Sequence, residues 1–247
     1  MVRVNVTIPV LNEVQQLAPS ITTLVGFLHR RLPYTWQVVI ADNGSTDGTA
    51  EVGRHLAGQL PGVAYEQIAQ PGRGRALRQV WSTTEAEICS YMDVDLSTNL
   101  EMYPSLVRAV ADEGYDLAIG SRLLRGSRTV RSVKRELLSR SYHLLVKLLF
   151  ANRFSDGQCG FKAIRTDVAR RLVPFVQNQT WFFDTELLLL AERSGCTIKE
   201  LPVEWIEDLD SRVKILRTAW EDVCGLLRVR CGRATKPVEA VVEEIPA

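Results

Sequence analysis

The sequence predicts an α/β protein with a mostly parallel, Rossmann-like sheet flanked by helices and a helical C-terminal extension. Two observations lead to this prediction. Strand and helix patterns alternate with short connections through the first half of the chain, which is typical of a doubly wound sheet. The second half changes to longer helices and one or two short strands. The 247 residues are therefore expected to form one domain with an appendage.

Each element of the first half has its own signal. Residues 2–10 alternate between apolar and polar side chains, and 36–41 form a continuous apolar strand. Further strands are predicted over 62–69, 87–94 and 116–121, with helices between them. The first helix is predicted within 14–31, because one stripe at helical spacing contains Leu17, Ile21, Leu24, Val25 and Leu28.

The second half supplies the boundaries of the extension. Helices are predicted over 134–150, 182–194 and 213–230, and short strands within 160–165 and 197–206. We expect three parts: an α/β domain over 1–211, an amphipathic helix over 212–232 and a disordered, Glu-rich tail over 233–247.

Composition and charge limit the function classes. Apolar residues make up 46% and charged residues 24%, which is typical of a globular protein with a sizeable core. A formal net charge of +1 argues against a nucleic-acid partner. The five cysteines lack C-x-x-C spacing and suit free thiols in a reducing cytoplasm. We expect no signal peptide, and no apolar run approaches the ~18–20 residues of a membrane span.

Polar side chains follow every predicted strand of the first half. In parallel sheets the carboxyl ends of the strands meet at one edge, where ligands bind. Five polar strand ends on one edge therefore predict a site there. Its members are Asn12 and Glu13, Asp42 and Asn43, Arg73, Asp93 and Asp95, and Arg122.

The stretch YMDVDLSTN places Asp93 and Asp95 directly after an apolar strand. One interpretation is that Asp95 or Ser97 caps the following helix. The other is that the two carboxylates hold Mg²⁺ or Mn²⁺ against substrate phosphates. A D-x-D triplet alone is weak evidence, and a second one occurs at 208–210. The company of the other polar strand ends favours the metal site at Asp93 and Asp95.

Two loops and a basic segment add candidate contacts. DNGSTDGT is typical of a turn, and its Asp42 could accept the imide N–H of a base. PGRGRAL has two glycines and two arginines before a helix, as a phosphate cradle has, but it matches no Walker or dinucleotide motif. Residues 122–135 contain six basic residues and no acid, ahead of an unusually apolar helix. Arginines suit phosphate, and basic residues beside apolar surface suit an anionic membrane.

The motifs IPVLNE, ADNGSTDGT, GRGRAL, DVD, GSR, SDGQCGFK, WFFDTELL and PVEW together resemble family 2 glycosyltransferases of the GT-A fold over about residues 2–216. The later motifs are closest to the polyprenyl-phosphate (dolichyl-phosphate) glucosyltransferase branch. The resemblance implies a nucleoside contact for Pro9, Glu13 and Asp42, with Arg73 near the base or diphosphate. It implies a divalent cation on Asp93 and Asp95. It also implies an acceptor-phosphate grip by Arg122, Arg135 and Ser139, with Asp156 and Gln158 flanking the reacting centre.

The implied reaction is inverting transfer of a hexose from a nucleotide sugar to a polyprenyl phosphate. UDP-glucose is the favoured donor and GDP-mannose the second choice. A phosphate acceptor is already anionic and needs no general base, whereas a soluble hydroxyl acceptor would need one, for which Asp184 and Glu186 are the candidates. A non-catalytic scaffold that binds nucleotide sugars is a third hypothesis.

Two departures from the resemblance affect these expectations. The chain lacks the transmembrane helices of many relatives, and Asn43 stands where a second acid is usual. We therefore expect peripheral attachment to the inner face of the plasma membrane through the helices at 137–150 and 212–230, and the sequence leaves a homo-oligomer open. In the second helix the apolar stripe comprises Val213, Leu216, Trp220, Val223 and Leu227.

Overall fold

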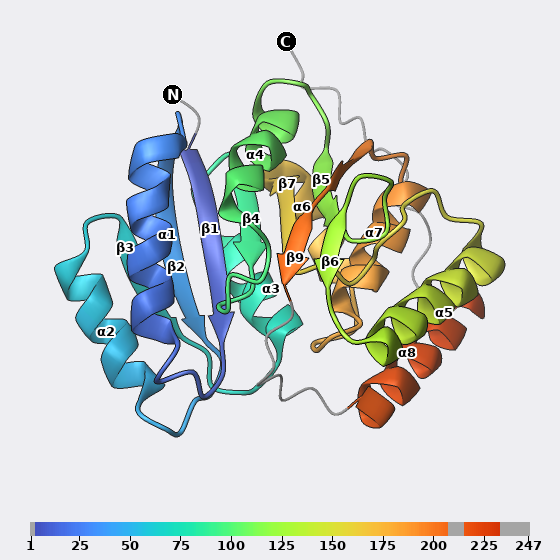
Figure 1. Ribbon diagram of the computed structural model, residues 1–247, viewed down its shortest axis with the longest axis horizontal. Coiled ribbons are helices and arrows are strands. Elements are labelled where there is room, and N and C mark those ends of the chain that lie inside the picture. The colour runs from blue at the N-terminus through green and yellow to red at the C-terminus, as the bar shows by residue number, and fades with distance from the viewer. Residues whose placement is uncertain (1–2, 207–214, 233–247) are drawn as a thin grey trace, which may run out of the picture.

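The computed structural model describes residues 3–206 and 215–232. A seven-stranded sheet with the order β3-β2-β1-β4-β7-β5-β8 forms its centre (Figure 1). The strands are β1 (Arg3–Val10), β2 (Thr35–Asp42), β3 (Val63–Gln67), β4 (Ile88–Met92), β5 (Leu117–Ser121), β7 (Phe161–Arg165) and β8 (Ile198–Pro202). A second, two-stranded sheet pairs β6 (Arg128–Val130) with β9 (Glu204–Ile206).

Helices lie on both faces of the large sheet and at one end of it (Figure 1). Short 3₁₀ turns, η1 (Leu100–Met102) and η2 (Val173–Phe175), precede or follow them. The α-helices are α1 (Leu17–Arg31), α2 (Thr49–Gln59), α3 (Arg73–Thr83), α4 (Tyr103–Ala111), α5 (Val133–Phe150), α6 (Thr166–Leu172), α7 (Phe183–Arg193) and α8 (Ile215–Arg230).

The sheet is parallel except for β7, which pairs antiparallel with both β4 and β5. The carboxyl ends of the other six strands therefore meet at one edge, together with the amino end of β7. Chain order reverses between β1 and β4, which is the switch point where such sheets bind ligands. The mostly parallel sheet predicted from the sequence is confirmed.

Two apolar cores, one on each face of the sheet, hold this arrangement together. One contains the first helix and the inner side chains of β1, and the other contains α3 and α7. Residues 4–10 of β1 are all buried, so the strand is covered on both faces despite its alternating sequence. Its two polar members satisfy each other, since the Thr7 hydroxyl donates to the Asn5 Oδ1 at 2.6 Å. These two side chains are therefore buried with a hydrogen bond between them.

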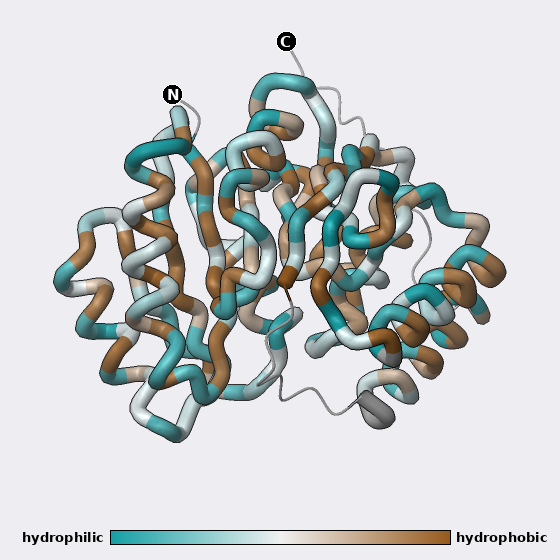
Figure 2. The backbone as a smooth tube through the Cα atoms, in the orientation of Figure 1, coloured by the Kyte–Doolittle hydropathy of each residue, from teal (hydrophilic) through white to brown (hydrophobic). Residues whose placement is uncertain are grey.

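The second half of the chain forms a projecting pair of helices. α5 and α8 pack against each other at the end of the sheet where the strand carboxyl ends lie (Figure 1, lower right). Apolar residues recur along both helices (Figure 2), and several are exposed: Val133, Leu137, Leu138, Leu144, Leu148, Trp220 and Leu227. Within the described ranges, no helix is both long and apolar enough to cross a bilayer.

Some boundaries differ from the sequence prediction. The predicted 197–206 strand is two strands, β8 and β9, in different sheets, and the short β6 and α6 were not predicted. The predicted C-terminal helix is present from residue 215. The second D-x-D at 208–210, the start of the 212–232 helix and the 233–247 tail lie outside the described residues.

Candidate active site

Asp93 and Asp95 lie just beyond the carboxyl end of β4, beside the chain-order switch. The Asp93 Oδ1 accepts from the Arg73 Nη1 at 3.1 Å, and the side chain is 38% exposed. The Asp93 Oδ2 faces Gly160, where an added Cβ would overlap it. Only glycine at 160 therefore leaves room for this carboxylate. Loss of water around it and the Asp95 and Asp184 carboxylates raise the pKa of Asp93, against the effect of Arg73.

Asp95 does not cap a helix. Its Oδ1 accepts from the backbone N–H of Ser97 at 3.0 Å, which closes a local turn through Leu96 at φ +51°. The cap of η1 is Asn99, whose Oδ1 accepts from the Glu101 N–H at 3.0 Å. The capping interpretation of Asp95 or Ser97 is therefore wrong, and it no longer competes with the metal interpretation.

Behind Asp93 lies a buried charge cluster centred on Asp184 of α7. Its Oδ2 accepts from the Arg73 Nη2 at 2.7 Å, and its Oδ1 lies 3.0 Å from the Lys162 Nζ and accepts from the Tyr91 hydroxyl. Asp184 is fully buried and Lys162 is 2% exposed. Arg73 also lies over the Trp181 ring, 4.4 Å from its centroid. Arg73 thus links the partly exposed Asp93 to the buried Asp184.

The two candidate bases of the WFFDTELL segment are both engaged in ion pairs. Asp184 is held by Arg73 and Lys162 as described. Glu186 is fully buried, and its two oxygens accept from the Arg228 Nη1 and Nη2 at 2.8 and 2.9 Å. A base needs an accessible lone pair directed at the proton it removes. Neither carboxylate offers one in this structure.

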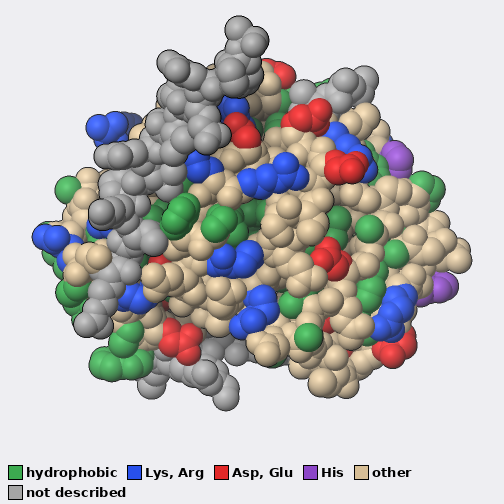
Figure 3. Space-filling model, turned by 180° about the vertical axis from the view of Figure 1, so that it is seen from behind, with side chains coloured by type: hydrophobic (Ala, Val, Ile, Leu, Met, Phe, Trp, Pro, Cys, Tyr) green, Lys and Arg blue, Asp and Glu red, His purple; other side chains and the backbone are tan. Residues whose placement is uncertain are grey.

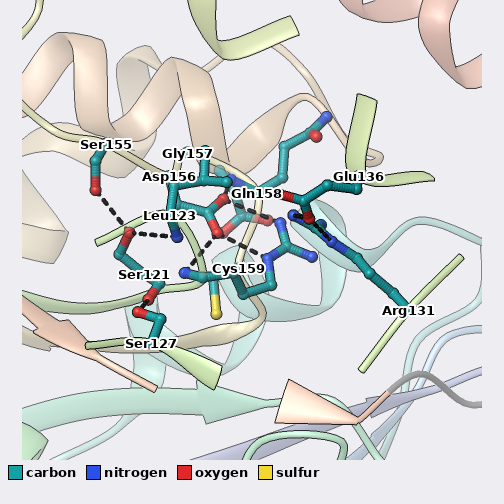
Figure 4. A network of polar contacts seen from close by, with 12 residues as sticks. Ser121, Leu123, Ser127, Arg131, Glu136, Ser155, Asp156, Gly157, Gln158 and Cys159 are labelled. Carbon is teal, nitrogen blue, oxygen red and sulfur yellow. Dashed lines mark hydrogen bonds and ion pairs between the residues drawn. The ribbon is translucent and has the colours of Figure 1, made fainter. Parts of the chain in front are cut away.

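Arg122 and Asp156 form a second, largely buried pair at the end of β5, and Figure 4 shows Asp156 beside Gly157 and Gln158 of the following loop. The Arg122 Nε and Nη2 donate to the Asp156 carboxylate at 2.7 and 3.0 Å, and the Arg122 N–H donates to it at 3.1 Å. Although burial opposes ionisation, Arg122 and these hydrogen bonds lower the pKa of Asp156 to about 2. The pair is a bidentate, charge-assisted contact. It joins the two ends of the segment 122–156, which contains β6 and α5.

The basic segment is internally paired in part. Arg131 and Arg140 both bind Glu136, the acid that follows the basic run on α5, and Figure 4 shows the contact of Arg131 with Glu136. Arg135 and Ser139 lie half-buried on the first two turns of α5, four residues apart and so on one face. Arg131 thus pairs with an acid of α5, whereas Arg135 and Ser139 lie together on one face of that helix.

Gln158 connects the site to the C-terminal helix. Its N–H donates to the Asp156 Oδ1 at 3.1 Å, and its Nε2 donates to the Asp222 Oδ2 of α8 at 2.7 Å. The Asp222 side chain is buried at 3% exposure. The loop between α5 and β7 is therefore held on one side by Arg122 and on the other by α8.

The proposed nucleoside residues lie together at the ends of β1 and β2. Pro9 pairs with Ala41 inside the sheet, and the Glu13 N–H donates to the Thr49 hydroxyl at 2.8 Å. Asp42 is fully buried, and its carboxylate accepts from the Ser45 N–H and the Tyr65 hydroxyl, both at 2.9 Å. Asp42 therefore braces the loop here and presents no open oxygen.

Three charged residues of the site were missed by sequence reasoning: the buried Lys162 and Asp222, and the half-buried Arg228. Lys162 had a visible signal, since it is a lone charge in the apolar strand FKAI. The other two belong to an amphipathic helix, where charges are expected on the solvent side. Within the described part of the chain, no group of three His, Cys, Asp or Glu residues could hold a metal. A cation on Asp93 and Asp95 would need further ligands from substrate and water.

Comparison with known sequences supplies a family. A model described as Glycosyl transferase family 2 matches residues 5–173. The glycosyltransferase AglD of Haloferax volcanii is 33% identical over 227 residues, covering 91% of this chain and 36% of the relative. A dolichyl-phosphate beta-glucosyltransferase of Trichomonas vaginalis is 30% identical over 219 residues, covering 84% of this chain and 65% of the relative. The chain thus spans about a third of the first relative and just under two thirds of the second.

Solved structures agree on the fold. The mannosyl-3-phosphoglycerate synthase of Rubrobacter xylanophilus has a TM-score of 0.70 at 16% identity, covering 95% of this chain and 76% of the neighbour. The glucosyl-3-phosphoglycerate synthase of Mycobacterium tuberculosis, solved with Mn²⁺, UDP and its product, has a TM-score of 0.66 at 17% identity, covering 93% and 80%. These likenesses confirm the predicted GT-A fold. Because that family model matches more than half of its length, the chain belongs to glycosyl transferase family 2.

Proposed function

We propose that this chain is an inverting, metal-dependent hexosyltransferase that moves glucose from UDP-glucose to a polyprenyl phosphate. The relatives described as dolichyl-phosphate beta-glucosyltransferases support the donor sugar and the acceptor class. The observation that carries the proposal is the ion pairing of Asp184 and Glu186. Because both carboxylates are engaged, an acceptor that arrives already ionised fits this site better than a hydroxyl that must lose a proton.

The donor would lie across the ends of β1, β2 and β4. Pro9 and Glu13 would hold the nucleoside, with Asp42 bracing the loop beside it, and Arg73 would lie on the diphosphate side, because its guanidinium already contacts Asp93. Asp93 and Asp95 would hold Mg²⁺ or Mn²⁺. The donor set fits a hard cation, since it consists of carboxylate oxygens, one of them in a space that glycine keeps open. Such a cation neutralises charge on a departing diphosphate.

The acceptor phosphate would lie on the opposite side, near Arg122, Arg135 and Ser139. Arg122 is preorganised, because Asp156 fixes its guanidinium in a largely buried position, with 13% of the side chain exposed. A fixed positive group needs little reorganisation when an anion binds. Asp156 and Gln158 would flank the reacting centre and hold the acceptor-side loop.

Attachment to an anionic membrane surface would bring the chain to its lipid acceptor. On α5, the exposed Val133, Leu137, Leu144 and Leu148 recur at spacings of four and seven and so share one face. Trp220 is 70% exposed on the neighbouring α8, and Arg140, Lys147 and Arg230 are exposed on the same two helices. On the reverse side of the molecule, charges of both signs are mixed (Figure 3). We propose that the α5–α8 pair lies in the headgroup region of the cytoplasmic leaflet.

The transfer test is a panel of nucleotide sugars with a short polyprenyl phosphate and Mg²⁺ or Mn²⁺, with products identified by mass. UDP-glucose should give glucosyl lipid phosphate, and GDP-mannose is the second candidate. Asp95→Asn should fold normally and lose nearly all turnover and metal-dependent donor binding. Normal activity of this variant in EDTA-treated buffer would remove the metal assignment. A wild type that binds UDP-glucose but transfers nothing would favour the non-catalytic scaffold.

Vesicle flotation tests the membrane claim separately. Wild type should float with anionic vesicles at low salt and be released by high salt, because each basic residue contributes about 1 kcal/mol near the surface. Leu148→Glu and Trp220→Glu should float less, whereas Thr22→Glu, an exposed change on the distant α1, is the matched control. A wild type that does not bind anionic vesicles sinks the claim and favours a soluble acceptor, as in the phosphoglycerate synthases of similar fold.

A further inference from the structure

The carboxylate of Asp222 is an unusual group for a C-terminal helix packed on a domain. It is 3% exposed, and its Oδ1 has no hydrogen-bond partner among the described residues. Buried carboxylates are costly unless fully paired. Neighbours of Asp222 on the same buried face of α8 are Gly225, Leu226 and Val229, as expected for a packing surface. Packing alone does not account for an acid at this position.

The other oxygen of Asp222 makes one specific contact. Oδ2 accepts from the Gln158 Nε2 at 2.7 Å, across 64 residues of chain. Gln158 lies two residues after Asp156, the partner of Arg122, and its N–H donates to the Asp156 carboxylate. The close approach of α8 needs Gly225, where an added Cβ would overlap the Phe182 ring. Because glycine at 225 lets α8 pack this closely, Asp222 can reach Gln158 in the loop between α5 and β7.

We propose that Asp222 is a positioning residue of the active site, which fixes the orientation of the Gln158 amide and makes α8 part of the transfer machinery. This inference rests on the proposed glycosyl transfer. An ionised carboxylate can only accept hydrogen bonds, so it selects the Nε2 of Gln158. The amide then presents its Oε1 as the group available to a sugar hydroxyl. A protonated Asp222 could donate to Oε1 instead and would turn the opposite end of the amide to the substrate.

Asp222 changes its charge within the physiological pH range. Burial raises the pKa of Asp222 to about 7, with Glu221 and Asp184 acting in the same direction and Gln158 and Arg73 against it. Asp222 is thus ionised above pH 7 and protonated below it, so turnover that needs the ionised form should rise with pH. Among the described residues, the charged and titratable groups that act on it are Glu221 on α8, Arg73 on α3, Asp184 on α7 and Tyr142 on α5.

A double-mutant cycle in the transfer assay tests the proposal. Asp222→Asn keeps the shape but removes the charge and adds a donor, so the Gln158 amide is no longer held in a single orientation. The variant should lower kcat about tenfold, with a change in donor KM of less than about twofold. Gln158→Ala should show a similar loss. If Asp222 acts through Gln158, the double variant is no worse than Gln158→Ala alone. Losses that multiply, or a wild-type kcat in Asp222→Asn, overturn the inference.

The pH profile of kcat gives a readout that a purely structural role would not move. The wild type should gain activity with a midpoint near pH 7, and Asp222→Asn should lack this step. Ionisation of the acceptor phosphate, with a pKa of about 6, is common to both enzymes and cancels in their ratio. Glu221→Gln leaves Asp222 in place and should move the midpoint to lower pH. Identical profiles in all three proteins overturn the inference, whereas a wild type without transfer overturns the proposed function itself.

Discussion

In α7, nine consecutive residues from Phe183 to Ala191 are buried, whereas in α5 the one buried side chain among those described is Val146. Both helices are leucine-rich in sequence. α7 also buries Asp184 and Glu186, each of which is paired with a cation. α5 instead exposes Leu137, Leu144 and Leu148. The two helices therefore have similar composition and opposite environments.

The difference shows what each helix contributes. The leucines of α7 belong to the core cluster on one face of the sheet and stabilise the fold by leaving water. The exposed leucines of α5 gain no such stabilisation from the domain, and together with Trp220 and Leu227 of α8 they leave an apolar surface uncovered. Uncovered surfaces of this kind mark interaction sites. α7 thus stabilises the fold, and α5 is available for a partner, which we propose is the membrane.

The largest expected effect is on α7. Asp184→Asn should lower the free energy of unfolding by about 3–5 kcal/mol, because Arg73 and Lys162 would be buried without their counter-charge. Urea unfolding followed by circular dichroism measures the change. Lys147→Gln, on an exposed position of α5, is the control and should stay within about 0.5 kcal/mol. A loss below 1 kcal/mol in Asp184→Asn would show that the buried cluster does not hold α7.

A matched leucine pair tests the comparison directly. Leu188→Ala should cost about 2–5 kcal/mol, because Leu188 is fully buried in the core. Leu148→Ala removes the same atoms from a side chain that is 75% exposed, and should cost less than about 0.5 kcal/mol. The same unfolding measurement serves for both variants. Equal losses would mean that α5 is packed as tightly as α7 in solution, and that its apolar face is not free for a membrane.

The strand pattern of the first half was predictable because hydrophobic periodicity is local. Each of the five strands predicted there is present, and Asp93, Asp95 and Arg122 lie at the expected edge. The antiparallel insertion of β7 between β4 and β5 was not predictable, because strand direction depends on pairing between distant segments. Gly160 and Lys162 lie near this edge because the amino end of β7 is there.

The site was predictable in position but not in its pairing. Asp184 is paired with Arg73 and Lys162, Glu186 with Arg228, and Asp156 with Arg122, and each partner is more than twenty residues away along the chain. No local pattern reports such contacts. Asp42 illustrates the same limit, since the resemblance implies a nucleoside contact for it but gives no sign of its burial against Tyr65.

The smallest expected effect concerns the Arg122–Asp156 ion pair, which joins the two ends of the segment that contains α5. The pKa of Asp156 is lowered from 3.8 to about 2, so folding favours its ionised form. The resulting stability, about 2 kcal/mol at 1.36 kcal/mol per unit, is fully present well above pH 4 and is lost as the pH falls through 4 toward 2. Asp156→Asn should therefore be less stable than wild type at pH 7, and the difference should narrow by about 1 kcal/mol at pH 3 and by about 2 kcal/mol at pH 2. Urea unfolding at several pH values measures the gap, with the more exposed Asp167→Asn as the control. A gap that is independent of pH would mean that Arg122 and Asp156 do not fasten the α5 segment to the domain.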